Sequence, residues 1–418
     1  MWEIWIDTGG TFTDGLARDP EGNLHRTKVL SNSRLRGLLT NGRLAAPWLT
    51  APIFDGYTLR IVETDQVFTV ESLGIDGLVN NGRGIPENGT IDLFTHEEAP
   101  VLATRLLTQT PLNQPFPALE IRLGTTKGTN ALLERKGGRV ALLVTKGFSD
   151  LLKIGTQQRP DLFQLAIPPA EVLYDDVLEV DERMAADGQI VTPLSDQTIA
   201  DLIGRFGQTK PDAVAISLLN AYRNPTHEHQ LRDALSKAGF SMITLSTDVS
   251  TAPGYVARTQ TAVVDAYLTP VLQSYLTNVQ TQVGNWPVRM MTSTGGLVRA
   301  DLFRPKDSLL SGPAGGVIGA AAVCNGTPVL TLDMGGTSTD VARIQNIPDY
   351  RFSTRIGSFD LQLPSLAIET VAAGGGSVCW FDGTGATSGQ LRVGPQSAGA
   401  SPGPACYGVG DLDQPGEA

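Results

Sequence analysis

One eight-residue pattern occurs twice in this chain, and it constrains the fold more than any other feature of the sequence. Asp7–Asp14 and Asp333–Asp340 both read Asp-x-Gly-Gly-Thr-x-Thr-Asp, with the same internal spacing. An apolar, strand-like run precedes the first aspartate of each copy. A single acid-Gly-Gly turn is common, but a second copy with identical spacing indicates two related strand–turn–strand units.

Each copy contains the residue types of a phosphate-binding turn. The paired glycines have no side chains, so the backbone can turn tightly and approach a ligand. Successive backbone N–H groups form an anion-binding concavity, and threonine hydroxyls add hydrogen-bond donors. The predicted nucleotide contacts in the two copies are Gly9, Gly10, Thr11, Thr13, Gly335, Gly336 and Thr337.

The aspartates have a different expected role, because an ionised carboxylate cannot donate a hydrogen bond to phosphate. Asp7 and Asp333 are predicted to hold Mg²⁺ beside the phosphates, directly or through its waters. Asp14 and Asp340 are the next acids, and we predict catalytic roles for them, with one orienting water. A plain hairpin with a Gly-Gly turn stays open as the alternative at each copy.

The duplicated hairpin resembles those of the actin, sugar-kinase and heat-shock-chaperone ATPase superfamily. Three further stretches narrow this resemblance: Leu123–Gly137 (LGTTKGTNALLERKG), Ser311–Val317 (SGPAGGV) and Val393–Tyr407 (VGPQSAGASPGPACY). Together with the hairpins they resemble the A half of the hydantoinase/5-oxoprolinase family, from residue 1 to about residue 408. The resemblance implies an α/β, actin-like (ribonuclease H-like) ATPase fold with two lobes across a nucleotide cleft.

Two more loops are candidate ligand sites. The loop Gly124–Asn130 follows a predicted strand and opens a short helix, an arrangement suited to an anion; Thr126 is the predicted contact and Lys127 could supply a cation. The triple glycine, Gly374, Gly375 and Gly376, stands where the superfamily has a loop against the adenosine. A polar loop or a turn without ligand is the alternative in each case.

Candidate substrate contacts lie just after residue 150. Arg159 precedes a proline in an extended segment beside Gln157, and arginine can hold a carboxylate through two parallel hydrogen bonds. An ion pair of Arg159 with a nearby aspartate is the alternative. Glu369 is a third candidate metal ligand. Many hydantoinase-like members carry Asp-Ile-His where this chain has Ala-Ile-Glu, so that metal site does not carry over whole.

Composition excludes several classes of partner. The formal net charge is −11 with Lys and Arg dispersed, which argues against a nucleic-acid surface and against anionic membranes. Three cysteines without a Cys-x-x-Cys pair favour a reduced, cytoplasmic protein, and the N-terminus does not resemble a signal peptide. The uncharged stretch 308–332 is rich in glycine and predicts a helix and a buried strand rather than a membrane span.

His227 and His229 lie near the start of a predicted helix. Residues two apart on a helix point to different sides, so the two histidines cannot chelate one ion together. We therefore expect an exposed helix start there.

The expected domains are an N-terminal lobe, 1–186, with a β-rich insertion at about 36–118, and a second lobe, 187–418. Family A halves are considerably longer, so the second lobe is expected to be incomplete at its C-terminus. The B half of the family is a separate subunit or a fused domain, which implies a B-type partner and an oligomer. A fragment, a truncated gene product and one piece of a split gene are all open interpretations.

The resemblance implies an ATP-dependent cyclic amide hydrolase, with 5-oxoprolinase as the nearest type. In that reaction ATP phosphorylates the amide oxygen of 5-oxo-L-proline, and water opens the ring to give L-glutamate, ADP and phosphate. The alternatives are an N-methylhydantoinase-type enzyme, an inactive nucleotide-binding protein that needs a partner, and a small-molecule kinase. The residues themselves support ATP and Mg²⁺ binding better than they support a lactam.

Overall fold

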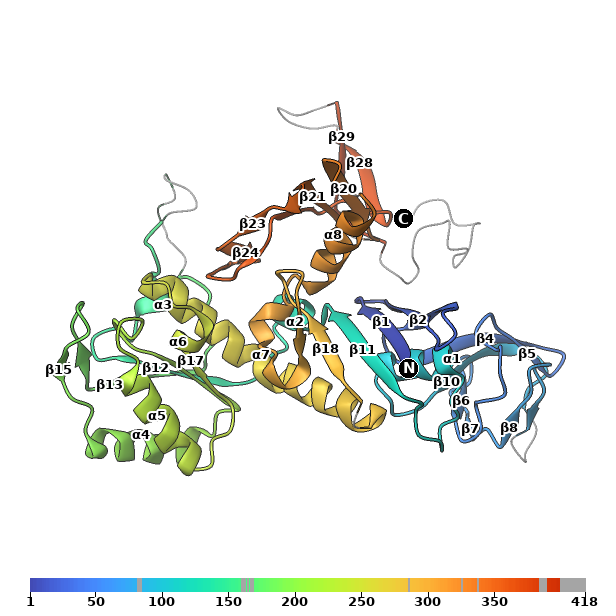
Figure 1. Cartoon of the computed structure of the whole chain (residues 1–418), viewed down its shortest axis with the longest axis horizontal. Helices are drawn as coiled ribbons and strands as arrows, with labels where there is room; N and C mark the ends of the chain where they lie inside the picture. Colours follow the sequence, from blue (N-terminus) through green and yellow to red (C-terminus); the bar gives the residue numbers. More distant parts are fainter. Residues whose placement is uncertain are drawn as a thin grey trace.

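The computed structural model describes residues 1–80, 85–158, 163, 165, 169–284, 286–324, 326–336, 338–382 and 389–398. Arg159 and Thr337, two of the predicted site residues, lie outside these ranges. Figure 1 shows three parts in a row, an α/β unit, a central sheet and a β-rich unit, with the C-terminal part above the centre.

The central sheet has six strands in the order β19-β18-β11-β1-β2-β3. The strands β1, β11 and β18 are parallel, whereas β2 and β3 continue from β1 as an antiparallel meander. This is the ribonuclease H-like strand order, and it confirms the predicted fold class. The six strands are β1 (Trp2–Thr8), β2 (Phe12–Arg18), β3 (Leu24–Leu30), β11 (Leu119–Thr125), β18 (Val288–Met291) and β19 (Leu297–Arg299).

The two faces of this sheet differ because successive strand residues point to opposite sides. Ile4 and Ile6 are buried on the face that α1 covers, whereas Trp5 and Asp7 point to the other face, toward α8. Gly15 also faces α1, because a methyl group built on it would lie 3.0 Å from Leu107. The helices around the sheet are α1 (Ala99–Thr108), α2 (Lys127–Leu133), α7 (Tyr255–Val283) and α8 (Ser311–Val323).

The predicted insertion at about 36–118 is β-rich, but α1 within it packs on β1, β2 and β3 and so belongs to the central layer. The β-rich unit itself is a five-stranded sheet in the order β5-β4-β10-β6-β7 with a small hairpin beside it. Its strands are β4 (Arg34–Thr40), β5 (Arg43–Ala45), β6 (Thr58–Ile61), β7 (Val67–Thr69), β8 (Ser72–Leu73), β9 (Val79–Asn80) and β10 (Gly89–Phe94).

The α/β unit is built around a parallel sheet in the order β13-β12-β16-β17. The strand pairing does not follow the predicted boundary at residue 186, because β12 and β13 precede that point and β16 and β17 follow it. The unit contains β12 (Val140–Thr145), α3 (Leu151–Ile154), β13 (Asp176–Val180), β14 (Arg183–Met184), β15 (Ile190–Thr192), α4 (Asp196–Thr209), β16 (Ala213–Ser217), α5 (Thr226–Lys237), β17 (Ile243–Leu245) and α6 (Ser246–Val249).

The prediction of an exposed start for α5 is wrong at His227. This residue is 3% exposed, and its Nδ1 lies 2.7 Å from Oε2 of the buried Glu182. Thr145, at the end of β12, donates a hydrogen bond to the other oxygen of Glu182. The network joins the ends of neighbouring strands to α5, so it holds this unit together.

The C-terminal part begins with two short 3₁₀ helices, η1 (Ala300–Leu302) and η2 (Pro305–Ser308), and continues through α8 into a second sheet. Within the described residues this sheet contains β20, β21, β22 and β27, with β21 between β20 and β27. The strands are β20 (Val329–Met334), β21 (Thr339–Gln345), β22 (Ile347–Pro348), β23 (Tyr350–Arg351), β24 (Thr354–Ile356), β25 (Phe359–Leu361), β26 (Ser365–Leu366), β27 (Ile368–Val371), β28 (Ser377–Asp382) and β29 (Gln390–Ser397).

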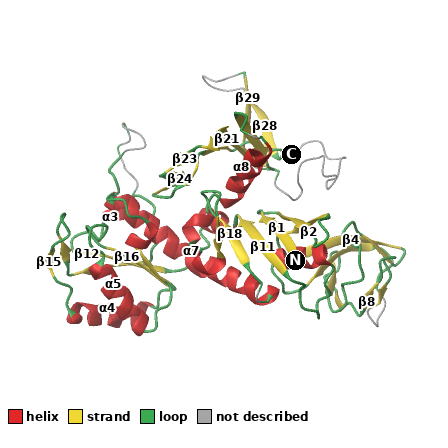
Figure 2. Cartoon of the chain, viewed as in Figure 1, coloured by secondary structure: helices red, strands yellow, loops and turns green. Residues whose placement is uncertain are grey.

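The strand predicted after the glycine-rich helix forms, but it is not buried. Leu330, Leu332 and Met334 on one face of β20 are all more than 60% exposed. In Figure 2 this strand region stands apart from the central sheet, joined to it by α8. Among the described residues no helix is both long and apolar enough to cross a membrane.

Candidate active site

The two sequence repeats form two hairpins with the same hydrogen-bonding geometry. Asp7 lies opposite Asp14 in the β1–β2 pair, and Asp333 lies opposite Asp340 in the β20–β21 pair. The Gly9 N–H donates to Phe12 O at 2.9 Å, and in the second hairpin the Gly335 N–H donates to Ser338 O at the same distance. The sequence repeat is therefore a structural repeat, down to the turn.

The second glycine of each turn stands at the hairpin tip. Within the described residues, the amides of Gly10 and Gly336 donate no hydrogen bond to the protein. Neither residue has a positive φ, and a methyl group built on Gly336 would meet nothing within 4 Å. The tips therefore present unused backbone donors, as an anion site requires. Asn130 lies beside the first tip, because a methyl group built on Gly10 would be 3.4 Å from Asn130 Nδ2.

The threonines of the two hairpins do not all face a ligand. Thr13 is fully buried, and its hydroxyl lies 3.1 Å from Ser31 Oγ, so it supports the hairpin from within. Its counterpart Thr339 is also buried and donates to Ala373 O at 2.5 Å. Thr11 is exposed at the first tip, where contact with phosphate stays a prediction.

Helix α8 lies against both hairpins and brings the first aspartate of each into one region. A methyl group built on Gly312 would lie 3.7 Å from Asp7 Oδ1, and one built on Gly316 would lie 3.3 Å from Asp333 Oδ2. Residues four apart share one helix face. The glycines of α8 thus leave room for both carboxylates on the same side of the helix.

Asp7 carries unfavourable negative charge in this arrangement. Partial burial raises the pKa of Asp7 above its ordinary value, and the nearby carboxylates of Asp14 and Asp333 raise it further, while Lys28 opposes them. Asp14 itself is exposed and forms an ion pair with Lys28 at 2.8 Å. Thr370 donates a hydrogen bond to Asp340 Oδ1 at 2.6 Å.

These carboxylates can supply only part of the ligand shell of a magnesium ion. The described residues contain no cluster of three or more His, Cys, Asp or Glu placed to hold a metal. Mg²⁺ commonly uses one or two carboxylates and completes its shell with water and phosphate oxygens. Asp7 and Asp333 match that donor set, and the raised pKa of Asp7 marks a place where a cation would offset negative charge.

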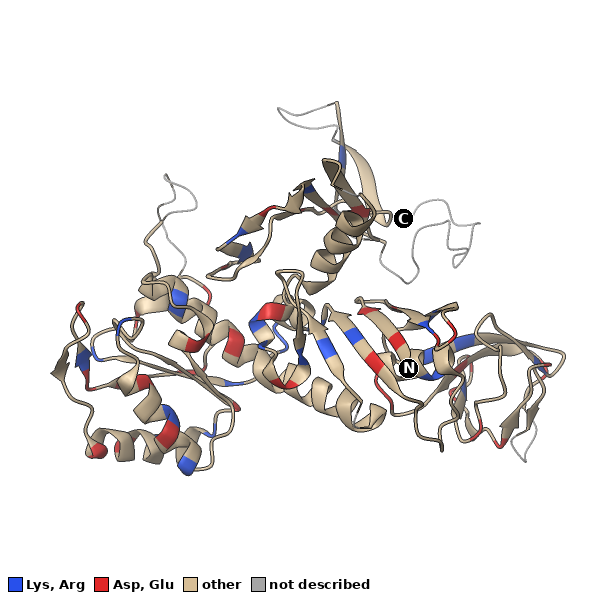
Figure 3. Cartoon of the chain, in the orientation of Figure 1, with Lys and Arg blue, Asp and Glu red and all other residues tan. Residues whose placement is uncertain are grey.

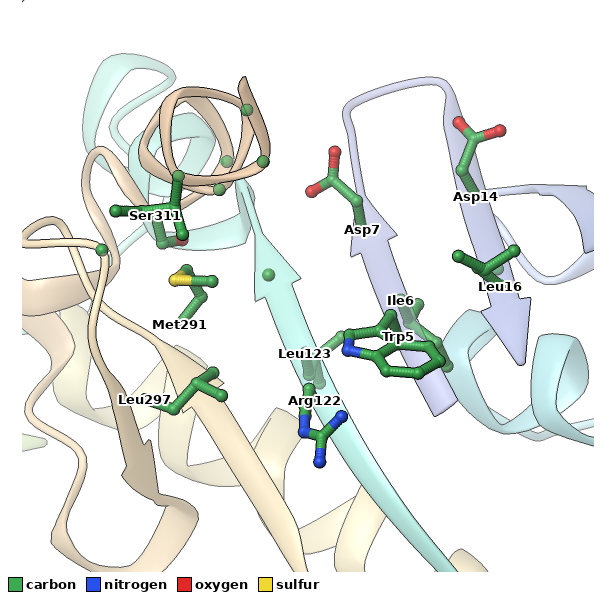
Figure 4. Close-up of a pocket in the computed structure, with 18 of the residues that line it drawn as sticks. Trp5, Ile6, Asp7, Asp14, Leu16, Arg122, Leu123, Met291, Leu297 and Ser311 are labelled. Carbon is green, nitrogen blue, oxygen red and sulfur yellow. The ribbon is translucent and has the colours of Figure 1, made fainter. Parts of the chain in front are cut away.

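A cavity of about 700 Å³ opens between the central sheet and α8 (Figure 4). Asp7 and Asp14 stand side by side at one end of it, on neighbouring strands, and Trp5 and Arg122 lie further along the sheet. The Arg122 guanidinium is 5.1 Å from the Trp5 ring centroid. The volume of this cavity is in the range of ordinary ligand pockets, ~300–1,000 Å³, and is large enough for a nucleotide.

Another cavity, of about 380 Å³, adjoins the first one, because Gly316 of α8 lines both; Asp333 and Asp340 line this second cavity. The triple-glycine loop reaches the tip of this second hairpin. The Gly375 N–H donates to Gly335 O at 2.9 Å, and the Gly376 N–H donates to Gly336 O at 2.7 Å. These two amides are used in the protein, so a nucleoside contact at 374–376 would have to come from other atoms of the loop.

The remaining predicted contacts are scattered. Thr126 joins the loop after β11 to β1, because its N–H donates to Thr8 O at 2.9 Å. Gln157 is exposed, at a positive φ just after α3, and lines none of the cavities described above. Glu369 pairs with Arg351 on the surface of β27's sheet. Substrate binding by Gln157 and metal binding by Glu369 stay predictions.

Sequence reasoning missed Lys28 and the two contact glycines of α8. The register of the meander places Lys28 opposite Asp14, so the hairpin pattern extended by one strand would have indicated that ion pair. The contacts of Gly312 and Gly316 depend on how α8 docks between two sheets, and no local signal in the sequence specifies that.

One hairpin lies on the ribonuclease H-like sheet and the other on the C-terminal sheet, and each places an aspartate against the helix that connects them. This arrangement is that of a two-lobed, actin-like α/β protein. Two family models match the chain: "Hydantoinase/oxoprolinase N-terminal region" at residues 81–239 and "Hydantoinase/oxoprolinase" at residues 258–413. The chain belongs to the hydantoinase/oxoprolinase family.

Named relatives agree with this assignment. 5-Oxoprolinase 1 of Arabidopsis thaliana is 37% identical over 357 residues, which is 77% of this chain and 28% of the plant protein. Caprolactamase subunit alpha of Pseudomonas jessenii is 33% identical over 99% of this chain and 53% of the subunit. The crystal structure of the ATP-dependent caprolactamase from Pseudomonas jessenii matches with a TM-score of 0.67 and 27% identity, over 97% of this chain and 52% of that chain. The chain thus spans about half or less of these relatives.

Proposed function

We propose that this chain is the nucleotide-binding A half of an ATP-dependent cyclic amide hydrolase, with 5-oxo-L-proline as substrate. The overall reaction is 5-oxo-L-proline, ATP and water giving L-glutamate, ADP and phosphate. The observation that carries the proposal is the pair of equivalent hairpins with Asp7 and Asp333 on the same face of α8. Relatives named 5-oxoprolinase and ATP-dependent caprolactamase support it.

The hairpins would bind and orient the phosphates of ATP. The amides of Gly10 and Gly336, which donate to no described protein group, would each donate to a phosphate oxygen. Asp7 and Asp333 would hold Mg²⁺, which neutralises phosphate charge when bound. The 700 Å³ cavity beside Asp7 would receive the rest of the nucleotide, with Trp5 as an apolar wall.

A lactam is a poor electrophile, and phosphorylation of its oxygen activates the ring carbon. A first water would add to that carbon, the C–N bond would break to give an acyl phosphate, and a second water would release phosphate and the amino acid. The protein must position the lactam oxygen against the terminal phosphate. Asp14 is a candidate to orient the water that opens the ring, and its ion pair with Lys28 would hold it in place. Asp340, held by Thr370, is the equivalent candidate in the second hairpin.

A neutral lactam is the second candidate substrate, because the caprolactamase subunit matches nearly the whole of this chain. N-methylhydantoinase-type activity is the third member of the same class. A panel of 5-oxo-L-proline, caprolactam and N-methylhydantoin, assayed for ADP release and for the ring-opened product, separates the three. A phosphorylated product that persists would instead indicate a small-molecule kinase.

We also propose a B-type partner subunit or domain, an oligomeric assembly and a cytoplasmic location. Support for a partner comes from the relative named as subunit alpha and from the exposed apolar residues Leu330, Leu332 and Met334 on β20. Cys324 and Cys379 are unpaired thiols, as a reducing compartment favours. Charges of both signs are interspersed over the described chain (Figure 3). This mixture agrees with our proposal that the protein does not bind nucleic acid.

The decisive experiment measures ADP and L-glutamate from 5-oxo-L-proline, with ATP and Mg²⁺ in excess, by the chain alone and with a B-type subunit added. The proposal expects the two products in equal amounts when both polypeptides are present. ADP release without glutamate, or no lactam-dependent ADP release in either sample, would overturn it.

A further inference from the structure

The tips of the two hairpins share one backbone geometry but differ in what lies beside them. Asn130 Nδ2 is 3.4 Å from a methyl group built on Gly10, whereas the same construction on Gly336 meets no described atom within 4 Å. Asn130 lies outside the repeated octapeptides, so the repeat itself supplies no counterpart for it. A side-chain amide therefore distinguishes the first tip from the second.

The loop between β11 and α2 holds Asn130 in this position. The N–H and the hydroxyl of Thr126 both donate to Thr8 O, at 2.9 and 3.2 Å, and so tie the start of α2 to the end of β1. Thr129 Oγ1 donates to Leu309 O at 2.6 Å, which ties the same helix to the segment before α8. Because Asn130 is in the first turn of α2, these two anchors fix its backbone relative to the hairpin.

The side chain of Asn130 has hydrogen-bonding capacity that the described protein groups do not use. A carboxamide carries two N–H donors and one carbonyl acceptor. Among the described residues its side chain makes one hydrogen bond, from Nδ2 to Thr126 Oγ1, and this bond is long at 3.4 Å. The side chain is also partly exposed, so a ligand can reach the N–H that remains.

A small cavity of about 160 Å³ lies beside this amide. Gly9, Gly10, Thr126, Lys127 and Asn130 are among the residues that line it. Pockets for larger ligands have volumes of ~300–1,000 Å³, so this cavity has room for one small group such as a phosphate and not for a nucleoside. The tip of the first hairpin and Asn130 thus face the same small space.

The charged groups in the wall of this cavity pair with each other. Lys127 Nζ is 3.4 Å from Glu98 Oε2, and Asn278 Nδ2 donates to the other oxygen of that carboxylate at 3.2 Å. An ammonium group has three N–H donors, so Lys127 keeps donors for a further acceptor. The acid in the wall therefore does not leave unpaired negative charge that would repel a phosphate.

We propose that Asn130 donates a hydrogen bond to the terminal phosphate of ATP, beside the amide of Gly10. The inference rests on the proposed function and adds a nucleotide contact that only the first hairpin has. A nucleoside does not fit a cavity of this size, so the phosphate end of the nucleotide is the part that reaches Asn130.

Two substitutions of Asn130 in the full chain test this contact by titration calorimetry with ATP and Mg²⁺. Asn130→Ala should weaken ATP binding by at least about tenfold, as expected for the loss of one hydrogen bond to a charged group. Asn130→Asp should weaken it further, because a carboxylate cannot donate and repels phosphate. The affinity for ADP, which lacks the terminal phosphate, should be unchanged in both variants.

Asn278→Ala is the matched control. The Asn278 carboxamide also makes a side-chain hydrogen bond, to Glu98, but Asn278 lines none of the cavities described above. This variant should bind ATP and ADP as the native chain does. Asn130→Asp keeps the shape of the side chain, and an acid in the first turn of a helix is favourable, so urea denaturation should show no loss of stability.

Native ATP affinity in both Asn130 variants would overturn the assignment. Equal losses for ATP and ADP would also overturn it, because they would show that the side chain acts on the shape of the turn and not on the terminal phosphate. The proposed function survives either result. A native chain that does not bind ATP would overturn the proposed function and this contact with it.

Discussion

Gly336→Ala should leave the protein as stable as before, or more so, while it weakens nucleotide binding. A methyl group on Gly336 meets nothing within 4 Å, and its φ is not in the left-handed region, so the fold has no steric reason to resist it. Replacing glycine by alanine in such a position stabilises a protein by about 0.4–1 kcal/mol, because the unfolded chain loses conformational freedom. We expect the methyl group, at the hairpin tip, to hinder the close approach of a phosphate oxygen to the backbone.

We expect the dissociation constant for ATP to rise by at least about tenfold, the equivalent of one displaced charge-assisted hydrogen bond. The assay is titration calorimetry with ATP, beside urea denaturation of the ligand-free chain. Gly204→Ala is the matched control: Gly204 lies inside α4, a methyl on it also meets nothing within 4 Å, and no cavity described above includes it. It should stabilise the chain by about 1 kcal/mol and leave ATP binding unchanged. A folded Gly336→Ala chain that binds ATP normally would refute the phosphate-turn interpretation.

Three further predictions follow from the same site. Asp7→Asn and Asp333→Asn should weaken Mg·ATP binding far more than metal-free ATP binding in calorimetry, and equal losses would rule out metal anchoring. The pKa of Asp7 in the folded, ligand-free chain is raised above the ordinary 3.8, so ionisation of Asp7 lowers the stability of the fold. Stability should therefore decline as pH rises from 3.8 through the raised pKa, and denaturation of Asp7→Asn should lack that component. The chain alone should bind ATP but form no glutamate from 5-oxo-L-proline, so turnover by the purified monomer would contradict the need for a partner.

The two hairpins could be predicted because their signals are local, whereas the fold class came from the family resemblance. Asp-x-Gly-Gly-Thr-x-Thr-Asp contains both the strand ends and the turn, and the register of Asp7 with Asp14 follows from the turn length. The domain boundary at residue 186 could not be placed in the same way. The strands β12 and β16 read as buried apolar runs, and such runs do not reveal which sheet they join.

Whether a given residue is buried or exposed was the least predictable feature of the chain. His227 stands at a helix start where the sequence predicts exposure, yet it is buried in contact with Glu182, which is far away in the sequence. Leu330 and Leu332 belong to an apolar run that predicts a buried strand, yet one face of β20 has nothing over it in the described chain. In both cases the outcome depends on what packs against the residue, which periodicity does not encode.

Helix α8 links the two hairpins in the structure. Gly312 faces Asp7 and Gly316 faces Asp333, so the two carboxylates are held about one helical turn apart, ~6 Å along the axis. The same helix packs on β11 and β18 below and on β20 and β21 above, so it is the rigid element between both sheets. A ligand that bridges Asp7 and Asp333 therefore binds both lobes at once, and any motion of one lobe relative to the other has to change that spacing. Larger side chains at either glycine would separate the carboxylates from the helix, which is the physical reason for the run of small residues in this segment.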